Sequence, residues 1–282
     1  IISSNASAFI VTSKEDLQQC PGIVVNNPYL AMIKILELFS KKLSIDHTIH
    51  ANTVISKSAS LGKNIGISAF SVIGENVTIG NNVTIGSGVK INSGATIGAN
   101  SSIKDNVVIY DDVIIGKNTL IHSGSIVGSD GFGFTTIDKV HHKIPHIKSV
   151  VIGNFVELGA TCTIDRGSVK NTIIEDYCKL DNQIHIAHNV KIEEGCLLAA
   201  GVCVGGSTVV GAYSMIGGKT DIGPHVILGK ESVFAARSCV LKSLEGGQMY
   251  AGNPARPIKE KQKRDAVFTR LEILERRLKK DA

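Results

Sequence analysis

An aliphatic side chain recurs at every sixth position through most of the chain. The series begins at Ile49 and continues without a gap to Val127. It resumes at Ile152, slips once after Ile164 and ends at Val240. A period of six fits neither an amphipathic helix nor an alternating strand, so the pattern predicts a repeat architecture.

Each six-residue unit has its own order of side chains. Glycine often follows the aliphatic residue, as in Ile73-Gly74, and the residue two places before it is small or β-branched, as at Val77 and Val83. Six residues suffice for one short strand and a turn, and three units close a triangular coil of about eighteen residues. The pattern therefore predicts a mainly β chain folded as a parallel β-helix, in which each unit is stabilised by stacking on its neighbours.

The repeat domain is predicted to span residues 43–250, and three segments depart from its period. Residues 1–42 form a mixed segment before the repeat. Residues 128–151 contain glycines and clustered polar and aromatic residues, so we expect an inserted loop that leaves the coil. Residues 251–282 are expected to form a helical extension.

The segment before the repeat carries a helix-start signal. Asn27 can cap a helix and Pro28 can open it. The spacing of the apolar residues that follow places three of them on the expected buried side, namely Leu30, Ile33 and Leu38.

The C-terminal extension combines a narrow apolar stripe with positive charge. Its apolar residues recur at three and four positions, a spacing suited to packing on copies of itself; they are Val267, Leu271, Leu274 and Leu278. From Arg256 to the end, basic residues outnumber acidic ones by ten to five. No series of stacking aromatics is interleaved with them, so a nucleic-acid site is not expected.

The composition agrees with a solenoid. Hydrophobic residues make up 43% of the 282 residues, aromatics only 5%, and Trp is absent. No apolar run approaches the roughly 18 residues of a membrane span, so we expect a soluble protein without a transmembrane segment. The chain begins without Met, a basic leader or a cleavage signal, and we expect that its start lies upstream.

The six cysteines form no CxxC pair and no metal-finger spacing. Cys162, Cys178 and Cys196 each stand two residues before an aliphatic position, in the inward slot for small residues. We expect buried free thiols in a reducing compartment, rather than disulfides or zinc ligands.

Four local strings make a resemblance to a known family specific. They are NPYL at 27–30, GSDGFGF at 128–134, TIDRG at 163–167, and DNQ followed by IAHNV within 181–190. With the order of the segments, they resemble the UDP-3-O-(3-hydroxyacyl)glucosamine N-acyltransferases of lipid A biosynthesis, within the hexapeptide-repeat acyltransferases. The resemblance covers essentially the whole chain, with the first part of the family's N-terminal uridine-binding domain missing.

The resemblance implies a left-handed parallel β-helix with a partial N-terminal α/β uridine-binding domain and a C-terminal helical tail. It implies a homotrimer whose active sites lie in the clefts between adjacent coils. The implied reaction moves a 3-hydroxyacyl chain from acyl carrier protein to the 2-amino group of UDP-3-O-(3-hydroxyacyl)glucosamine, in the cytoplasm of a Gram-negative-type bacterium. No metal is implied, and no cofactor besides the phosphopantetheine of the carrier.

Acyl carrier protein is acidic, so docking of this donor is the expected role of the basic tail. A solvated coiled-coil face is the alternative.

The histidine of the family's IAHN string is its general base, and it corresponds to His188. Ile186 is an interior position, so His188 is expected at or near a corner, where a neutral imidazole can take a proton from an attacking amine. Gly206 lies one coil later, and its backbone N–H is expected beside the histidine as the oxyanion donor. The resemblance gives His225 a substrate-binding or charge-stabilising role.

The resemblance also implies a set of substrate-binding residues. An Asn and an aromatic residue of the N-terminal domain hold the uracil in the family, and the glycine-rich insertion lies near the sugar and diphosphate. The family often has IPQxG where this chain has IPHIK at 144–148, so the insertion departs from the pattern there. The DNQ string orients the base or the amine, or is a structural turn. The residues are Asn27, Tyr29, Asp130, Phe132, Phe134, Lys143, His146, Asp181, Asn182, Gln183 and His185.

Two other functions share parts of these patterns. The string HIAH resembles the related UDP-N-acetylglucosamine O-acyltransferases, although the insertion and the N-terminal segment favour the N-acyltransferases. Hexapeptide trimers resembling γ-class carbonic anhydrase bind zinc through three histidines. His185, His188 and His225 match that number but not that family's spacing. Isolated histidines such as His47 and His122 are expected to be solvated scaffold residues.

Overall fold

The computed structural model describes residues 4–18, 20–40 and 47–278, without the side chains of 272–274 and 276–278. The chain divides into two compact units, Ile1–Ile45 and Asp46–Ala282. Each unit is described by itself below.

The first unit pairs two short parallel strands and ends in a helix. Strand β1 (Phe9–Val11) and strand β2 (Gly22–Val24) flank a 3-10 turn, η1 (Glu15–Leu17), and helix α1 (Pro28–Phe39) follows. The side chain of Asn27 accepts a hydrogen bond from the Leu30 N–H at 3.1 Å, which confirms the predicted cap. The predicted buried side of this helix is wrong, because all of its expected members, Leu30, Ile33 and Leu38, are exposed.

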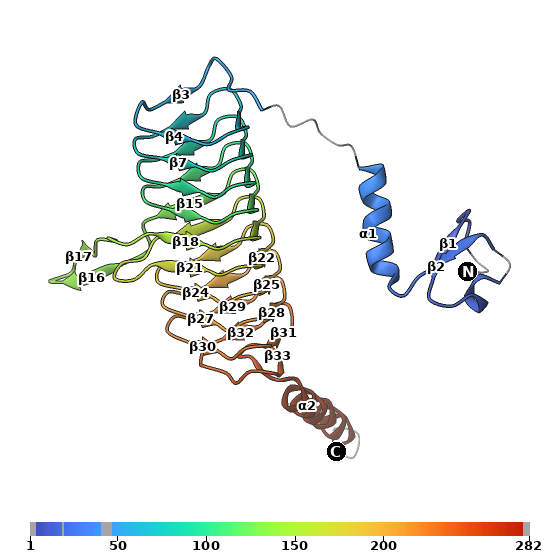
Figure 1. Cartoon of the computed structure of the whole chain (residues 1–282). Helices are drawn as coiled ribbons and strands as arrows, with labels where there is room; N and C mark the ends of the chain where they lie inside the picture. Colours follow the sequence, from blue (N-terminus) through green and yellow to red (C-terminus); the bar gives the residue numbers. More distant parts are fainter. Residues whose placement is uncertain (1–3, 19, 41–46, 279–282) are drawn as a thin grey trace. The chain divides into compact units, whose positions relative to one another are not determined.

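The second unit is a three-sided coil in which one strand of each face belongs to each turn (Figure 1). Sheet 1 consists of β4 (Ser60–Leu61), β7 (Thr78–Ile79), β10 (Thr96–Ile97), β13 (Ile114–Ile115), β18 (Val150–Ile152), β21 (Thr172–Ile174), β24 (Lys191–Ile192), β27 (Val209–Val210) and β30 (Ile227–Leu228).

The second face of the coil continues to the last turn. Sheet 2 consists of β5 (Gly66–Ile67), β8 (Thr84–Ile85), β11 (Ser102–Ile103), β14 (Leu120–Ile121), β19 (Glu157–Leu158), β22 (Lys179–Leu180), β25 (Leu197–Leu198), β28 (Met215–Ile216), β31 (Val233–Phe234), β33 (Met249–Ala251) and β34 (Arg256–Pro257). Only the last pair, β33 with β34, is antiparallel among the described strands of this sheet.

The third face carries the strand that leads to the IAHNV string. Sheet 3 consists of β3 (Val54–Ile55), β6 (Val72–Ile73), β9 (Lys90–Ile91), β12 (Val108–Ile109), β15 (Ile126–Ser129), β20 (Thr163–Asp165), β23 (His185–Ile186), β26 (Cys203–Val204), β29 (Asp221–Ile222) and β32 (Cys239–Val240).

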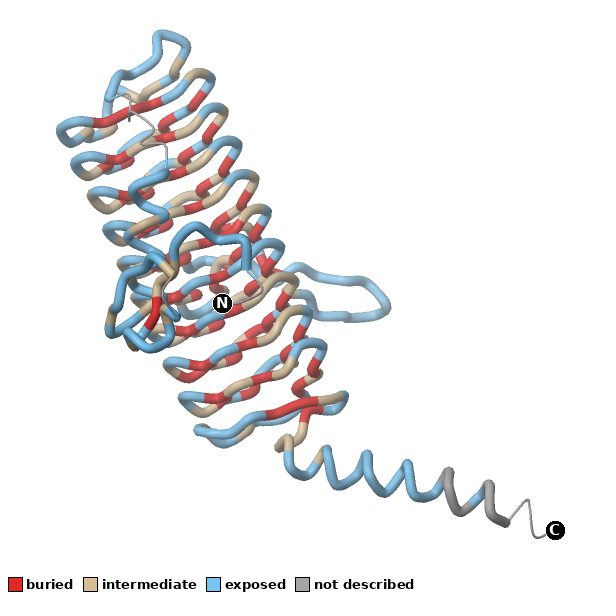
Figure 2. Tube along the Cα trace, turned by 90° about the vertical axis from the view of Figure 1, so that its right-hand side faces the viewer, coloured by how far each residue is buried: buried red, intermediate tan, exposed pale blue. Residues whose placement is uncertain are grey.

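The periodic aliphatic residues form the core, as predicted. Ile85, Ile103 and Ile121 pair in register, eighteen residues apart, and each is at most 2% exposed. Figure 2 shows the buried positions recurring along successive turns. A column of stacked side chains removes apolar surface from water at every coil, which stabilises the solenoid as a whole.

The corners of the coil need backbone conformations that few residues tolerate. Many corner positions have positive φ and are occupied by Asn or Asp, such as Asn64, Asn82 and Asn100. These residues adopt the left-handed conformation at low cost. Here their amides also bond from one coil to the next, at 3.2 Å for Asn64 to Asn82 and 3.0 Å for Asn82 to Asn100.

The two interruptions of the period lie where the chain leaves the coil. The insertion forms a projecting hairpin of β16 (Phe134–Ile137) and β17 (Val140–Lys143), which pair antiparallel (Figure 1). The slip after Ile164 becomes a short loop between β20 and β21. Both interruptions lie close to the corner that follows β23, as the contacts described below show.

The cysteines and the C-terminal segment complete the outline. Cys162, Cys178 and Cys196 are fully buried and free, as expected. Helix α2 (Ile258–Leu278) confirms the helical extension. In the expected stripe Val267 and Leu271 are exposed, whereas the side chains of Leu274 and Leu278 lie outside the described ones. No helix in the described ranges is long and apolar enough to cross a membrane.

The core column can be tested by a single truncation. Ile103→Ala is expected to lower the free energy of unfolding by about 2–5 kcal/mol, because the methyl groups leave a cavity between two packed coils. Urea denaturation followed by circular dichroism measures the loss. Lys90→Ala, an exposed position on β9, is the control and is expected to change stability by about 0.5 kcal/mol or less. Equal losses in the two variants would contradict a core role for Ile103.

A candidate active site at one corner of the coil

His188 lies at a corner, as the sequence predicts. Strand β23 ends at Ile186 and β24 begins at Lys191, so the residues between them turn the chain from sheet 3 to sheet 1. Asn189 has φ of 59° and forms the turn. His188 directly precedes it, with its side chain partly exposed. The side chain therefore stands at the outer edge of the coil.

Gly206 lies directly beside His188 on the next coil. The Ser207 N–H donates to the His188 carbonyl at 2.9 Å, and the His225 N–H donates to the Gly206 carbonyl at 2.9 Å. These bonds stack three successive corners. A Cβ on Gly206 would lie 2.7 Å from Cε1 of His188, so only glycine lets the ring rest against this backbone. The Gly206 N–H donates to no acceptor among the described residues.

Asn189 clamps the corner to the loop between β20 and β21. Its side-chain oxygen accepts the Ser168 N–H at 3.0 Å, and its backbone N–H donates to Oγ1 of Thr172 at 2.9 Å. The amide nitrogen therefore faces Nδ1 of His188, at 2.9 Å. Because an amide NH₂ group only donates, the neutral His188 ring in this arrangement accepts at Nδ1 and carries its hydrogen on Nε2. The string IAHN thus fixes the ring orientation through its own asparagine.

The insertion covers the other side of the His188 ring. A Cβ on Gly131 would lie 2.8 Å from Cδ2 of His188 and 3.0 Å from Nε2 of His146. The rings of His146 and His188 make an edge contact, with centroids 5.3 Å apart and planes at 70°. Two segments far apart in sequence therefore enclose one imidazole.

The surroundings shift the proton affinity of His188. Its partial burial lowers its pKa below the ordinary 6.5, and the nearby imidazoles of His146 and His225 lower it further, because like charges on neighbouring rings would repel. A lower pKa means that the neutral ring persists to lower pH, as a proton acceptor requires.

Asp165 belongs to the same region, although sequence analysis does not single it out as a site residue. Its carboxylate lies 3.7 Å from Nε2 of His185 and accepts a hydrogen bond from Ser129 at 3.2 Å. Nδ1 of His185 bonds Oγ1 of Thr163 at 2.8 Å. Burial raises the pKa of Asp165. The TIDRG string contains the residue, so the signal was present in the sequence.

The remaining site residues of the insertion, Asp130, Phe132, Phe134 and Lys143, are exposed. Asp130 forms a salt bridge with Lys143, whose hydrogen bond lowers the pKa of the Asp130 carboxyl. Phe132 and Phe134 are exposed, with ring centroids 5.2 Å apart. The structure thus gathers Asp130 and Lys143 in one pair near the glycine segment.

The DNQ string lies at a different corner from His188. Asp181, Asn182 and Gln183 follow β22 and precede β23, where sheet 2 turns into sheet 3. Asp181 accepts the Asn182 and Ala200 N–H groups at 2.7 and 3.1 Å, and Asn182 accepts the Ala160 N–H at 2.8 Å. These bonds brace neighbouring turns, as expected of the structural-turn alternative.

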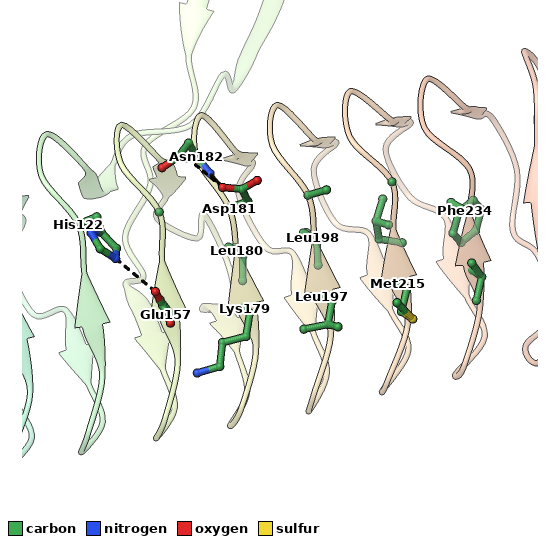
Figure 3. A pocket seen from close by; sticks show the side chains of 15 residues that line it. His122, Glu157, Lys179, Leu180, Asp181, Asn182, Leu197, Leu198, Met215 and Phe234 are labelled. Atoms are coloured by element: carbon green, nitrogen blue, oxygen red, sulfur yellow. Dashed lines mark hydrogen bonds and ion pairs between the residues drawn. The ribbon is translucent and has the colours of Figure 1, made fainter. Parts of the chain in front are cut away.

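Asp181 and Asn182 also line a groove of about 700 Å³ on the outer face of sheet 2. Figure 3 shows Leu197 and Met215 along it, with Lys179 and the His122–Glu157 pair toward one end. His122 is bonded to Glu157 at 3.2 Å, which makes it a paired scaffold residue rather than a purely solvated one. His188 does not line this groove.

The two residues expected at the uracil belong to the first unit. Asn27 caps α1, and Tyr29 is exposed on its first turn. The capping role of Asn27 is thus shown by geometry, and its binding role stays a prediction. Within the described residues no group of three His, Cys, Asp or Glu side chains could hold a metal ion.

Comparisons with known proteins agree on one family. A model described as bacterial transferase hexapeptide (six repeats) matches residues 58–93, 94–129 and 171–206. The UDP-3-O-acylglucosamine N-acyltransferase of Campylobacter lari is 45% identical over 258 residues, which cover 90% of this chain and 78% of that protein. The chain belongs to the family of UDP-3-O-acylglucosamine N-acyltransferases.

Other members of this family match over shorter stretches. A Legionella pneumophila UDP-3-O-acylglucosamine N-acyltransferase 2 is 48% identical over 140 residues, and a Rickettsia akari family member is 46% identical over 149. These matches cover 50% and 53% of this chain. The chain spans 41% and 43% of the length of those relatives.

Solved structures of another acyltransferase confirm the fold of this family member. The UDP-N-acetylglucosamine O-acyltransferase of Moraxella catarrhalis aligns with a TM-score of 0.60 at 24% identity, over 77% of each chain. The structure from Acinetobacter baumannii aligns with 0.59 at 24% identity, also over 77% of each. They share the left-handed parallel β-helix. At this identity they do not favour O-acylation over N-acylation.

The Asn189 contact predicts how His188 titrates. Asn189→Asp keeps an oxygen for the loop N–H groups but replaces the donor at Nδ1 by a carboxylate, which favours the charged ring. The pKa of His188 is expected to rise by about 1–2 units. NMR titration of ¹³C-labelled histidine measures it. Asn182→Asp is the control, because Asn182 also accepts a neighbouring backbone N–H. A rise in the pKa of His188 in Asn182→Asp but not in Asn189→Asp would contradict the proposed contact between Asn189 and His188.

Proposed function

We propose that this protein transfers a 3-hydroxyacyl chain from acyl carrier protein to the 2-amino group of UDP-3-O-(3-hydroxyacyl)glucosamine. The observation that carries the proposal is the His188 ring resting against Gly206, in a chain that belongs to a family named for this N-acylation. A proton acceptor and an uncommitted N–H then lie side by side, as acyl transfer to an amine requires.

The chemical step follows from these groups. The amine nitrogen attacks the thioester carbonyl carbon, His188 takes the proton that the nitrogen loses, and the carbon–sulfur bond breaks as the amide forms. The proton then passes from His188 to the thiolate of the departing phosphopantetheine, so protons balance. The lowered pKa of His188 supports the base role, because it keeps the ring neutral at cytoplasmic pH.

Gly206 is the proposed oxyanion donor. Attack on the thioester places negative charge on the carbonyl oxygen, which needs a fixed donor in a site shielded from water. The Gly206 N–H takes no part in the hydrogen bonds between coils among the described residues. It belongs to a backbone segment that lies against the His188 ring.

The Asn189 contact adds a requirement to the base step. Nε2 can take the amine proton only when Nδ1 carries the ring hydrogen. We therefore include a half-turn of the Asn189 amide, which presents its oxygen to Nδ1–H and releases the Ser168 N–H. The same turn also takes the amide oxygen away from the Val169 and Lys170 N–H groups, so it links the base to the loop between β20 and β21.

The substrate residues are assigned by their place on the insertion and on the first unit. The Asp130–Lys143 pair and Phe132 and Phe134 are proposed to meet the sugar and diphosphate, where Lys143 supplies positive charge. Asn27 and Tyr29 are proposed to hold the uracil, with the tyrosine as a stacking platform.

Polar residues on both sides of β23 complete the proposed site. His225 and His185 contact polar groups of the acceptor, and His185 is oriented for this by Thr163 and Asp165. The DNQ residues orient the acceptor from the neighbouring corner.

The assembly and partners form part of the same proposal. The protein acts as a cytoplasmic homotrimer, and the basic residues of α2 dock the acidic carrier. The relatives come from bacteria, among them Campylobacter, Legionella and Rickettsia. No cofactor besides the carrier's own phosphopantetheine enters the step.

The base role predicts a large loss in His188→Ala. Acyl transfer from 3-hydroxyacyl carrier protein to UDP-3-O-acylglucosamine is expected to fall by about a hundredfold or more. In the unchanged protein, the loss of kcat/KM that follows protonation of His188 is expected only at a pH below the ordinary 6.5 of an imidazole, because the pKa of His188 is lowered. UDP-N-acetylglucosamine serves as a competing acceptor. Preferred acylation of that sugar, or a fully active variant, would overturn the proposed function.

The oxyanion role predicts a comparable loss in Gly206→Ala. The added Cβ overlaps the His188 ring and displaces the N–H from the reacting carbonyl, so kcat is expected to fall by about a hundredfold. Gly218→Ala is the control, since the nearest atom to its Cβ is 3.2 Å away. Equal kcat values for the two variants would contradict the role of Gly206 as oxyanion donor.

A further inference from the structure

His146 is the point at which the insertion returns to the coil. Its side chain is 6% exposed, whereas both of its chain neighbours are exposed. A Cβ on Gly133 would lie 2.8 Å from Cε1 of His146, and one on Gly131 would lie 3.0 Å from its Nε2. The glycines of the GFGF string thus make room for a buried imidazole. That imidazole lies edge-on against His188.

Both ring nitrogens of His146 are buried and have no hydrogen-bond partner. Buried polar atoms are nearly always paired in folded proteins, because an unpaired one costs free energy. A buried ring without partners beside a reactive histidine therefore requires a functional explanation. Nε2 lies against the glycine segment and Nδ1 is buried as well, so direct contact with a substrate is not the role that this geometry favours.

Both acidic and basic side chains lie around the two histidines. His146 faces Asp130, which is paired with Lys143, and Asp165, which lies beside His185. Arg166 lies near Asp130. His225 lies two corners farther along the coil, beyond Gly206. No carboxylate among the described residues shifts the pKa of His188, whereas the ring of His146 is in contact with the His188 ring.

We propose that His146 is a positioning residue for His188: its buried ring holds the His188 imidazole in one orientation against Gly206. The inference rests on the proposed function, in which His188 is the base. An exposed histidine turns freely about its side-chain bonds, and reaction rates fall steeply when a reacting group is misaligned. Contact with Gly206 on one side and with Gly131 and His146 on the other removes that freedom.

The ring and the charge of His146 can be separated by two substitutions. His146→Phe keeps a ring at the contact but cannot carry charge. His146→Gln removes the ring and has the side chain that the family's IPQxG string offers. His142→Gln, on the exposed hairpin strand β17, is the matched control for loss of one histidine.

The first measurement is the NMR titration of His188 in the full chain, with ¹³C-labelled histidine and His188→Ala for assignment. Loss of the buried ring in His146→Gln exposes the His188 imidazole to water, and its pKa is therefore expected to rise by about half a unit or more. His146→Phe is expected to give a smaller rise, and His142→Gln none. An unchanged titration in both His146 variants would overturn the inference.

The second measurement is steady-state kinetics on the same proteins. His146→Gln is expected to lower kcat about tenfold at an unchanged KM for the acceptor, while His146→Phe keeps kcat within about threefold. A raised KM with unchanged kcat would instead make His146 a substrate-binding residue and overturn the positioning role. The titration is independent of turnover. An active His188→Ala variant would therefore refute the proposed function and leave the effect of His146 on His188 measurable.

Discussion

The backbone ladder between successive coils is the constraint on which the rest of the molecule depends. Outside the insertion, the slip and the last turn, each strand bonds the equivalent strand eighteen residues away, so the residues of these strands have a fixed neighbour on the coil above and on the coil below. Adjacent strands in a sheet lie about 4.8 Å apart. The ladder therefore stacks the aliphatic core and the corner asparagines. It also places a histidine on one coil within contact of a glycine on the next.

Most of this architecture follows from the sequence because the period is so regular. The six-residue spacing predicts which residues are buried, from Ile67 to Val240, and that Cys162 and its equivalents point inward. The handedness does not follow from periodicity and depends on likeness to solved structures. The buried side of α1 was wrong because helical spacing shows which residues share a face. It does not show whether another segment covers that face.

For the candidate site too, some contacts follow from the sequence and others do not. The ladder fixes the corner position of His188 and its contact with Gly206, and counting eighteen residues predicts both. His146 reaches the same corner through the insertion, where counting gives no register. Asp165 ends β20, where the slip begins, and lies beside His185. The contact of the Asn189 amide with the ring depends on how the loop between β20 and β21 presents its N–H groups. No linear spacing encodes that arrangement.

The corner asparagines bonded from coil to coil have a further consequence for how such a protein can change its length. Asn64, Asn82 and Asn100 lie in coils that contribute no side chain to the corner at His188. Removing or duplicating one full turn there preserves the asparagine ladder and the inward aliphatic residues, because the two ends that are joined occupy equivalent positions of the repeat. A change of any other length keeps the ladder only where the extra residues loop out at a corner, as in the insertion and in the loop between β20 and β21. Within the regular coils the number of turns can therefore change without a change at the corner of His188.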